Sequence, residues 1–515
     1  MIEGELVMVF NTKDGKIKKI DELKKIIGNH PRKKKVIMCH GTFDIVHPGH
    51  VRQLYYAKEK AEILIASITA DKYVEKGFGR PFVPQELRAK NLAALEMVNY
   101  VIIDENKTPI KNILNLKPDL FIKGFEYQKN GVHPKTKDEI KTVESYGGRV
   151  IFSPGDIVYS SSHLLTIHKP KISFEKLISY MDAENISFED ILDTLDKFKD
   201  TKVDVIGDTI VDKYSFCTVL GPTTKTPTFS VKLKSSEKYI GGAGIVAKHI
   251  KSLGADVKFT TIIGEDSLKK FVLDDLKKWN INTNVIIDPT RPTTLKERFW
   301  ADGYKMLQVD VVDNSVISEK ILEKICEITK KGNPDLIVFS DFRHGIFNKD
   351  TIKKILESSS KKAVKVADSQ VSNRWGNILD FKGMDIIFPN EKEARFALGD
   401  QDTGIRPLAK KLYMQSKSKY LILKMGEKGC IIYRNPGEHP RDFFILDSFA
   451  ENIVDAVGAG DAMMAVVSLA YKCSKNILIS SILGNIAAGL ICEKEGNIPL
   501  TIEKIKQRIN RIKNS

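Results

Sequence analysis

Two histidines in the N-terminal third have the spacing of a phosphate-binding pair. His47 and His50 lie three residues apart in CHGTFDIVHPGH, which begins at Cys39. On a helix this spacing lets both imidazoles face one anion. Pro48 is a favoured first helical residue, and the unpaired N–H groups of a helix N-terminus attract phosphate. The stretch therefore predicts a phosphate cradle, in which Gly41 lets a ligand approach the backbone.

A second group with chemical potential lies near the C-terminus, in DAVGAGDAMMA (455–465). A glycine-rich turn leads there into a helix of small residues, so the N–H groups of Gly458, Ala459 and Gly460 can surround an anion. Asp461 follows at the mouth of this helix, where it can take a proton from an alcohol that attacks ATP. The pattern predicts a phosphotransfer site with Asp461 as its base.

The elements that position the first site alternate between strands and helices. From Lys34 onward the apolar runs VIMC, ILIASIT, YVIID and DLFIKG are separated by amphipathic helical stretches. This alternation predicts a parallel α/β sheet, whose ligands gather at the carboxyl ends of the strands. Other cations and hydroxyls in this half are suited to phosphate, namely Arg80, Arg88, Lys123, Ser160, Ser161 and Ser162.

The strand and helix rhythm stops and then restarts in the middle of the chain. Two short amphipathic helices are expected between them, the second beginning with a capping box at Ser187 and Asp190. A second α/β pattern begins near Val203. We therefore expect four segments: an N-terminal extension (1–33), a first α/β domain (34–166), a helical linker (167–200) and a second α/β domain (201–515).

Composition narrows the class of protein. The 515 residues carry 81 basic and 66 acidic side chains, a net charge of +15, and no basic run is interleaved with aromatic residues. The six cysteines lie far apart, which argues against a disulfide framework or a zinc site and favours a reducing compartment. With no leader-like N-terminus and no long apolar run, we expect a cytoplasmic enzyme with neither membrane nor nucleic-acid partners.

The first half resembles the small nucleotidyltransferases whose hallmark is His-x-Gly-His. RPFVPQELR, followed by a strand that ends in KGFEY, is similar to the adenylyltransferase half of bacterial heptose kinase/adenylyltransferases. The resemblance implies a Rossmann-like domain in which a substrate phosphate attacks the α-phosphorus and pyrophosphate leaves. It implies catalytic roles for His47, His50 and Lys123, and phosphate or nucleotide binding by Gly41, Thr42, Phe43, Arg88, Ser160, Ser161 and Ser162.

The second half resembles the ribokinase-like, PfkB-type sugar kinases. GGAGIVAKHIKSLGADVKFTTIIGED, from Gly241, and DAVGAGD are similar to the two signatures of that family, with Ala456 in place of a threonine. The resemblance implies an α/β/α domain with a small β lid, and Asp461 as catalytic base. It implies sugar binding by Asp208, Asp212, Gly241, Gly242 and Asp368, Mg²⁺ held through water by Asn390 and Glu393, and nucleotide binding by Lys424, Gly426, Gly429, Gly458, Ala459 and Gly460.

Departures from the heptose enzymes bear on the substrate. Ile245 and His249 stand where heptose kinases have asparagines, and losing two amides near a polyol site would change specificity. The domain order is also reversed, which suggests an independent fusion and a related pathway. The predicted lid, 229–239 with strands around 297–310, belongs to a type that often pairs between subunits, so we expect a homodimer.

The sequence thus predicts a bifunctional enzyme that makes a nucleotide-activated sugar. The kinase would use Mg-ATP on heptose 7-phosphate at O1, and the other half would join AMP to a sugar 1-phosphate, giving ADP-heptose. In the pathway that the resemblance implies, a separate phosphatase acts between the two steps. An alternative is a cytidylyltransferase, using CTP, fused to a kinase for another sugar or polyol. A sensor that binds nucleotide sugars without turnover is a further alternative, against which His47, His50 and Asp461 argue.

Overall fold

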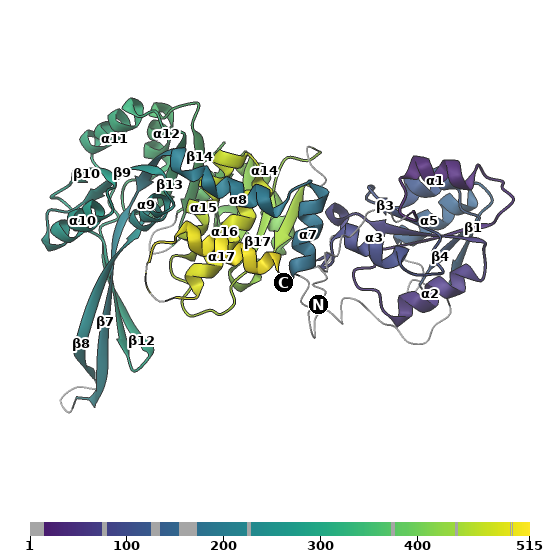
Figure 1. The fold of residues 1–515 in the computed structure, drawn as a ribbon, viewed down its shortest axis with the longest axis horizontal. Coiled ribbons are helices and arrows are strands. Elements are labelled where there is room, and N and C mark those ends of the chain that lie inside the picture. The colour runs from purple at the N-terminus through teal and green to yellow at the C-terminus, as the bar shows by residue number, and fades with distance from the viewer. Residues whose placement is uncertain are drawn as a thin grey trace, which may run out of the picture. The chain divides into compact units, whose positions relative to one another are not determined.

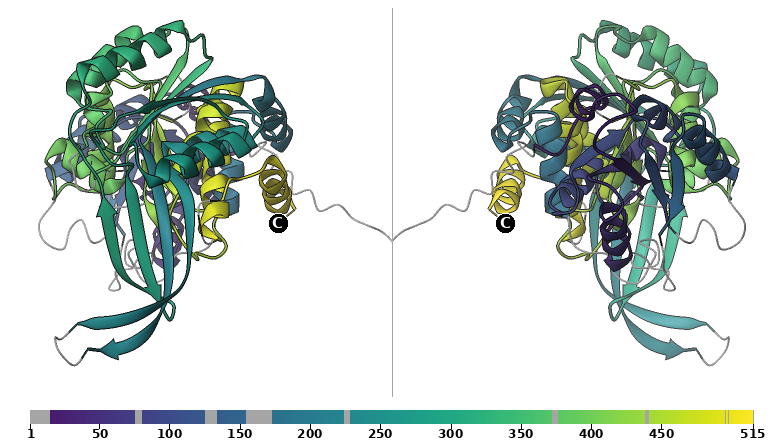
Figure 2. Two further views of the ribbon diagram at one scale, coloured as in Figure 1. Left: turned by 90° about the vertical axis from the view of Figure 1, so that its left-hand side faces the viewer. Right: turned by 90° about the vertical axis from the view of Figure 1, so that its right-hand side faces the viewer.

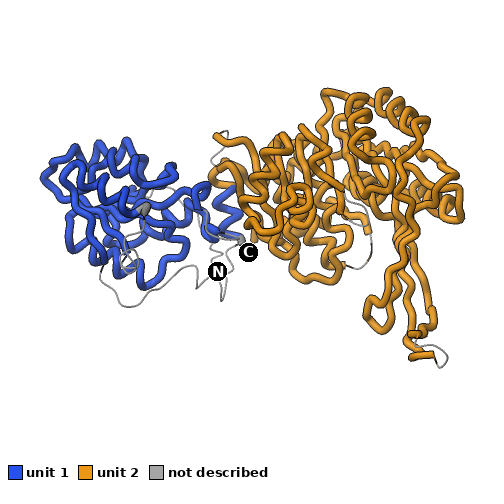
Figure 3. Tube along the Cα trace, turned by 180° about the vertical axis from the view of Figure 1, so that it is seen from behind, with its two compact units in different colours: residues 1–180 blue, residues 181–515 orange. Residues whose placement is uncertain are grey.

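The computed structural model describes residues 15–74, 80–124, 134–153, 173–223, 228–371, 376–437, 441–494, 496 and 498–514. The chain divides into two compact units, residues 1–180 and 181–515 (Figure 3). The boundary falls inside helix α7 (Ser173–Ala183). The finer domain limits stay a prediction. Among the described residues, no helix is both long and apolar enough to cross a bilayer.

Unit 1 contains a five-stranded sheet in the order β3-β2-β1-β4-β5, and every neighbouring pair is parallel. This confirms the parallel α/β sheet predicted for the first half. Its strands are β1 (Val36–Gly41), β2 (Ile63–Thr69), β3 (Tyr100–Asp104), β4 (Leu120–Lys123) and β5 (Arg149–Phe152). Its helices are α1 (Ile20–Ile27), α2 (Pro48–Lys58), α3 (Gln85–Ala93), α4 (Ile110–Leu116) and α5 (Pro134–Glu144).

Apolar side chains cover both faces of this sheet, as continuous apolar strands require. One core cluster joins the strands to α2 and α3, for example through Leu54 and Leu92. The other joins them to α1, α4 and α5, for example through Leu23, Ile113 and Val143. With both faces covered, the carboxyl ends of the strands are the place left for a ligand.

The N-terminal extension, whose role the sequence does not reveal, belongs to this unit. Ile17 forms a parallel bridge with Val101, the N–H of Lys18 donates to the Val101 carbonyl at 2.9 Å, and Leu23 of α1 is fully buried. Residues 15–27 therefore extend the edge of the sheet at β3 and cover part of one face.

Unit 2 is built on a nine-stranded sheet in the order β10-β9-β6-β13-β14-β15-β16-β17-β18. Its strands are β6 (Lys202–Gly207), β9 (Asp256–Ile263), β10 (Asn282–Ile287), β13 (Leu336–Asp341), β14 (Val364–Ser369), β15 (Ile386–Ile387), β16 (Tyr420–Lys424), β17 (Cys430–Tyr433) and β18 (Phe443–Leu446). The strands are parallel from β10 to β16, and β17 and β18 continue the sheet antiparallel.

A separate four-stranded sheet forms the lid, in the order β12-β11-β7-β8. The lid strands are β7 (Thr209–Pro222), β8 (Phe229–Gly242), β11 (Leu295–Ala301) and β12 (Tyr304–Val311). Figure 1 shows β7, β8 and β12 extending beyond the body of unit 2, and both views of Figure 2 show the same long ribbon. The predicted α/β/α domain with a small β lid is confirmed.

The helices of unit 2 cover its sheet in layers. Helices α9 and α15 pack on the central strands and on each other, and α16 and α17 lie outside them. Helix α8 packs on α15, α16 and α17, so the second of the two predicted linker helices belongs to the kinase-like body. The helices are α8 (Phe188–Asp196), α9 (Ala243–Ser252), α10 (Ser267–Lys278), α11 (Glu319–Lys331), α12 (Lys349–Ser358), α13 (Glu391–Leu398), α14 (Ile405–Ser416), α15 (Ala459–Ser474), α16 (Ile477–Cys492) and α17 (Ile502–Lys513).

Candidate active sites

The glycine-rich turn of unit 2 brings Asp461 to the carboxyl ends of the parallel strands. Gly458 has φ 81° and caps α15, so Asp461 lies in the first turn of that helix. Lys424 ends β16 and Asp368 lies near the end of β14. These three residues are distant in sequence, and the order of the strands brings them together.

A buried ion pair links two members of this site, because Lys424 Nζ lies 2.6 Å from Asp368 Oδ2. Burial, followed by the negative charge of Asp368, raises the pKa of Asp461 to about 7, against the opposing effect of Lys424. A carboxyl group with this pKa can accept a proton near neutral pH, as a general base must. The electrostatics therefore suit the role predicted for Asp461.

Asn390 and Glu393 form a capping box at the start of α13. The Asn390 side-chain oxygen accepts from the Glu393 N–H at 2.9 Å, and the Asn390 N–H and side-chain amide donate to the Glu393 carboxylate, both at 2.7 Å. Burial is the main cause that raises the pKa of Glu393 to about 7. Asn390 thus caps a helix and also fixes a carboxylate beside Lys424.

A pocket of about 570 Å³ joins these groups to the glycine-rich turns. This volume lies in the range of small-ligand sites. Gly429 is required in its wall, since a Cβ there would lie 1.9 Å from the Leu446 carbonyl oxygen. Of the predicted residues, the pocket brings together Asn390, Glu393, Lys424, Gly426, Gly429, Gly458, Ala459, Gly460 and Asp461.

The donor set of this pocket fits Mg²⁺. Asp368 Oδ1 is buried without a hydrogen-bond partner in the described part of the chain, and the carboxylate of Glu393 lies beside the same lysine. No group of three or more potential metal ligands occurs among the described residues. Mg²⁺ commonly uses one or two carboxylates together with substrate phosphates, and Asp368 and Glu393 offer two carboxylates. Asp368 and Glu393 would hold the ion, which when bound neutralises charge on phosphate oxygens.

Of the three aspartates predicted to bind sugar, Asp368 forms the pair with Lys424, while Asp208 and Asp212 have other surroundings. Asp208 is buried, and its Oδ2 accepts from the N–H groups of Phe342 at 3.0 Å and His344 at 3.3 Å, so it holds the loop after β13. Asp212, on the lid strand β7, is paired with Arg298 of β11. Both carboxylates lie near the lid. The carboxylate of Asp208 is already hydrogen-bonded to backbone N–H groups of the protein.

The glycine pair that ends β8 includes one glycine, Gly242, that a close backbone approach requires. Gly242 has φ 59°, and a Cβ at this position would lie 2.4 Å from the Asp208 carbonyl oxygen. The N–H of Ala243 donates to that carbonyl at 2.9 Å. Gly241 and Gly242 therefore join the lid to α9 directly over Asp208.

His249 lies inside the protein, contrary to the expectation that it is near a polyol site. Its side chain is 1% exposed, and its Nδ1 accepts the N–H of Leu500 at 3.1 Å. Burial lowers the pKa of His249 to about 3, so the ring is neutral. Ile245, in the same helix, is also buried. His249 anchors the segment before α17, because its ring faces the protein interior and not a polyol site.

Strand β11 carries two cations, Lys296 and Arg298, that no sequence motif predicts as site residues. Lys296 and Arg298 alternate along the strand, and Lys296 is opposite Asp212 in the lid sheet. Burial lowers the pKa of Lys296, while Asp212, Asp310 and Asp461 act to raise it. The available signal was the alternation in LKERFW, which predicts that both cations share one face of a strand.

In unit 1 the predicted histidine pair lies at the start of α2. His47 is the N-cap residue, Pro48 opens the helix, and the rings of His47 and His50 are stacked with centroids 3.8 Å apart. The ring of Phe43 lies 4.8 Å from that of His50. The structure thus brings both imidazoles to one helix N-terminus, beside the carboxyl end of β1, as the motif predicts.

A third histidine, His40, lies under this site. Its Nδ1 lies 2.9 Å from the Ser67 hydroxyl, and its Nε2 lies 3.3 Å from the Thr69 hydroxyl. Burial, assisted by the charge of Lys123, lowers the pKa of His40 to about 3. The ring is therefore neutral, and its 3.8 Å approach to Asp104 is not an ion pair at neutral pH.

Arg88 has a place that differs from the one expected of a phosphate ligand. It is fully buried in α3. Its guanidinium donates to the carbonyl oxygens of Thr42, Thr69 and Val83 and to the Asp71 carboxylate. Arg88 therefore clamps the loop that carries Thr42 against the ends of two strands, and direct phosphate contact is not part of this geometry.

The remaining cations of this half are also paired. Lys123, which ends β4, lies 2.7 Å from a Glu139 carboxylate oxygen in a buried ion pair. Arg80 donates to Asp44 at 2.8 Å. Lys123 borders the carboxyl end of the sheet, where a nucleotide phosphate could compete with Glu139. The predicted residues Ser160, Ser161 and Ser162 lie outside the described residues.

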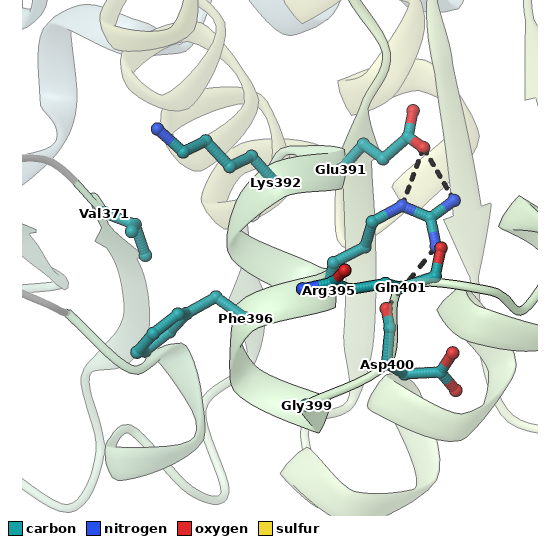
Figure 4. Close-up of a pocket in the computed structure, with 8 residues that line it drawn as sticks. All are labelled: Val371, Glu391, Lys392, Arg395, Phe396, Gly399, Asp400 and Gln401. Carbon is teal, nitrogen blue, oxygen red and sulfur yellow. Dashed lines mark hydrogen bonds and ion pairs between the residues drawn. The ribbon is translucent and has the colours of Figure 1, made fainter.

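A hollow of about 770 Å³ lies along α13 and includes Val371, which also lines the pocket of Asp461. Figure 4 shows Lys392 and Phe396 projecting on the side of Val371, while Arg395 points to Glu391 and donates to it at 2.9 Å. None of the predicted catalytic residues lines this hollow. We therefore assign the chemistry to the pocket of Asp461.

The fold and the cluster around Asp461 define a small-molecule phosphotransferase of the α/β class. Comparison with known families identifies it further. Residues 200–504 match the pfkB family of carbohydrate kinases, which is more than half of the chain, so the protein belongs to that family. Residues 38–185 match the cytidylyltransferase-like family.

The chain is also similar to curated relatives and to solved structures. The chain is 28% identical over 339 residues to the bifunctional protein HldE of Desulfatibacillum aliphaticivorans, and 26% identical over 312 residues to that of Nitratiruptor sp.. These alignments cover 64% and 59% of this chain, and 66% and 64% of the relatives. The crystal structure of phosphofructokinase-2 from Escherichia coli in complex with potassium matches 61% of this chain and 99% of its own, with a TM-score of 0.51 and 14% identity, which shows the shared fold.

Proposed function

We propose that this protein makes a nucleotide-activated sugar by two reactions at two separate sites. Unit 2 phosphorylates a sugar or sugar phosphate with Mg-ATP, and unit 1 transfers a nucleotide to a sugar 1-phosphate with release of pyrophosphate. The observation that carries the proposal is Asp461, with a pKa of about 7, in a glycine-lined pocket beside the pair of Lys424 and Asp368. The name of the relatives, bifunctional protein HldE, supports the combination.

In the kinase reaction, Asp461 takes the proton of the acceptor hydroxyl as its oxygen attacks the γ-phosphorus. The N–H groups of the turn before α15 face the phosphates, and Lys424 supplies positive charge next to them. We propose heptose 7-phosphate as the acceptor, phosphorylated at O1. The test is incubation with Mg-ATP and heptose 7-phosphate, and absence of ADP formation would reject this acceptor.

In the nucleotidyl transfer, the work is positioning and stabilisation of charge, since the acceptor phosphate is already a nucleophile. His47 and His50 would bind the triphosphate at the N-terminus of α2, and Lys123 would exchange Glu139 for a phosphate oxygen. We propose ATP as the donor and ADP-heptose as the product. The measurement is pyrophosphate release from ATP with heptose 1-phosphate.

A second candidate is a cytidylyltransferase that gives a CDP-linked sugar or polyol. The match of residues 38–185 to the cytidylyltransferase-like family favours it. Pyrophosphate release with CTP and ATP, each offered with the same panel of sugar 1-phosphates, distinguishes the two. Faster release from CTP would replace ADP-heptose by a CDP-linked product.

We also propose that the protein acts as a homodimer joined through its lids. The lid exposes apolar side chains on β8 and β12, with Tyr304 76% exposed and Leu233, Leu307 and Phe229 each more than half exposed. Exposed apolar side chains gathered on one sheet are typical of contact surfaces. Light scattering of the full chain tests this, and replacement of Leu307 by Asp should shift the mass to that of a monomer.

A further inference from the structure

A second pocket of unit 2, about 370 Å³ in volume, lies on the lid and outside the site of Asp461. We call it the lid pocket and define it by its four aromatic side chains, Tyr214, Phe216, Tyr239 and Trp300. Tyr214 and Tyr239 meet edge to face with centroids 5.7 Å apart. Such a concentration of aromatic surface in a concave site is typical of ligand pockets.

The register of the lid strands places this pocket next to the predicted acceptor site. Residues two apart on a strand share a face, so Asp212, Tyr214 and Phe216 form one row of β7. Tyr214 is opposite Arg298 of β11, and Phe216 is opposite Trp300. The lid pocket therefore continues the row that begins at Asp212.

Two polar atoms in this pocket have no hydrogen-bond partner among the residues that the structure describes. They are the hydroxyl of Tyr214, whose side chain is 6% exposed, and the indole Nε1 of Trp300. Burial raises the pKa of Tyr214 to about 12, so its hydroxyl keeps its proton. A buried donor without an acceptor is costly, and both residues line a pocket that can admit one.

The charges around the pocket select the ligand. Glu237, Asp302 and Asp455 line it, and its lining includes no Lys, Arg or His among the described residues. Arg298 lies 5.4 Å from the Tyr214 ring but is already paired with Asp212. An anionic group would be repelled here. A simple cation would suit the carboxylates but could not accept a hydrogen bond from either donor.

We propose that the lid pocket binds an uncharged polyhydroxylated group, either a sugar ring or the polyol chain of a sugar. Hydroxyls donate to the carboxylates and accept from Tyr214 and Trp300, and the C–H faces of the group pack on the aromatic rings. The group can be an uncharged hydroxyl-bearing part of the kinase acceptor, a source that rests on the proposed kinase activity, or a separate sugar. A phosphate carried by the acceptor would lie outside this pocket.

Tryptophan fluorescence and calorimetry of the full chain test binding without any turnover. The probes are an uncharged heptose, mannose and mannitol, with mannose 6-phosphate as the anionic comparison. We expect a saturable change in emission with the uncharged probes, which Trp300→Phe removes. By calorimetry, Tyr214→Phe should weaken binding about fivefold to tenfold, the effect of one hydrogen bond. Tyr304→Phe, an exposed lid tyrosine outside the pocket, is the matched control and should bind as the wild type does.

Three results would overturn the proposal: no heat and no emission change with any uncharged probe, equal or tighter binding of mannose 6-phosphate, or equal losses in Tyr214→Phe and Tyr304→Phe. A thermal midpoint of Tyr214→Phe close to that of the wild type excludes misfolding as the cause of a loss.

Kinase kinetics then separate the two sources of the group. If the pocket holds the uncharged hydroxyl-bearing part of the acceptor, Tyr214→Phe raises the KM for the acceptor about fivefold to tenfold with kcat nearly unchanged, and the acceptor competes with the uncharged probe. If the pocket holds a separate sugar, KM stays the same and no competition occurs. Failure of the proposed kinase function would appear differently, as wild-type protein that binds the probe but forms no ADP.

Discussion

The two candidate sites of this chain solve different chemical problems with different arrangements of charge. Around Asp461, buried carboxylates gather about one lysine, and burial raises the pKa of Asp461 to about 7. Around His47 and His50, the arginine and lysine side chains predicted for phosphate are paired inside the protein, and the site presents two stacked imidazoles. An alcohol must lose a proton to attack, whereas a phosphate need not. The proposed kinase site accordingly contains a carboxylate that can act as a base, and the proposed nucleotidyltransferase site would rely on positioning.

Replacing Asp461 should produce the largest difference between the two sites. Asp461→Asn keeps the shape of the side chain but cannot accept the proton, so kinase kcat should fall about 10²-fold to 10⁴-fold. Nucleotidyl transfer should be unchanged, because unit 1 carries its own motif. ADP release and pyrophosphate release are measured on the same preparation, with the exposed Asp274→Asn as control. Unchanged ADP release in Asp461→Asn would end the kinase assignment.

Replacing Arg88 tests whether this residue stabilises unit 1 or binds a phosphate. Arg88→Met would remove the hydrogen bonds that Arg88 donates to Asp71 and to three carbonyl groups, so we expect unit 1 to lose about 3–5 kcal/mol in free energy of unfolding. Denaturant unfolding measures this, and the exposed Arg52→Met should change it by about 0.5 kcal/mol or less. Normal stability with a raised KM for nucleotide would favour the phosphate role instead.

Removing one imidazole is the reciprocal of removing the base. His47→Ala should lower nucleotidyl transfer about 10²-fold to 10³-fold, as loss of a group that stabilises developing charge does. The kinase should keep its rate. The partly buried His30, which lies 3.4 Å from Asp119, is the control, and His30→Ala should retain both activities. Loss of both reactions in His47→Ala would contradict separate sites.

The pH dependence sharpens the comparison further. Since Asp461 must be deprotonated to act, kinase kcat/KM should fall about tenfold per unit as pH decreases below about 7. Glu393, whose pKa burial also raises to about 7, should steepen this decrease, because its protonated carboxyl would hold Mg²⁺ poorly. The residual kinase activity of Asp461→Asn should not show the decrease in kcat/KM that protonation of Asp461 causes in the wild type. A flat profile between pH 5 and about 7 in the wild type would contradict the role of a raised carboxyl pKa.

Local patterns predicted the layers of both units well, because strand alternation and glycine-rich turns are short-range signals. The helix N-termini at Pro48 and Ala459 are examples. Contacts between strands that are distant in sequence were harder to predict. The pair of Lys424 and Asp368 depends on the order of β14, β15 and β16, which no local pattern encodes. The sequence predicts phosphate binding by Arg88, and its burial was not predictable because its carbonyl acceptors come from three separate segments.

His249 and Lys296 are two further residues whose environment could not be predicted from local sequence. A substitution in a family motif drew attention to His249, yet its ring bonds to Leu500, about half the chain away. No motif marked Lys296, which faces the acceptor side only because β11 pairs with β7. Residues whose role depends on sheet pairing therefore required the structure.

The central claim is that one chain carries two independent active sites that together build a nucleotide-activated sugar. The most direct measurement is ³¹P NMR of the full chain with Mg-ATP, heptose 7-phosphate and heptose 1-phosphate in one sample. We predict resonances of both ADP and pyrophosphate, with Asp461→Asn removing only the ADP signal that depends on heptose 7-phosphate. A wild-type sample that forms only one of the two products, or an Asp461→Asn sample that loses both, would contradict the claim.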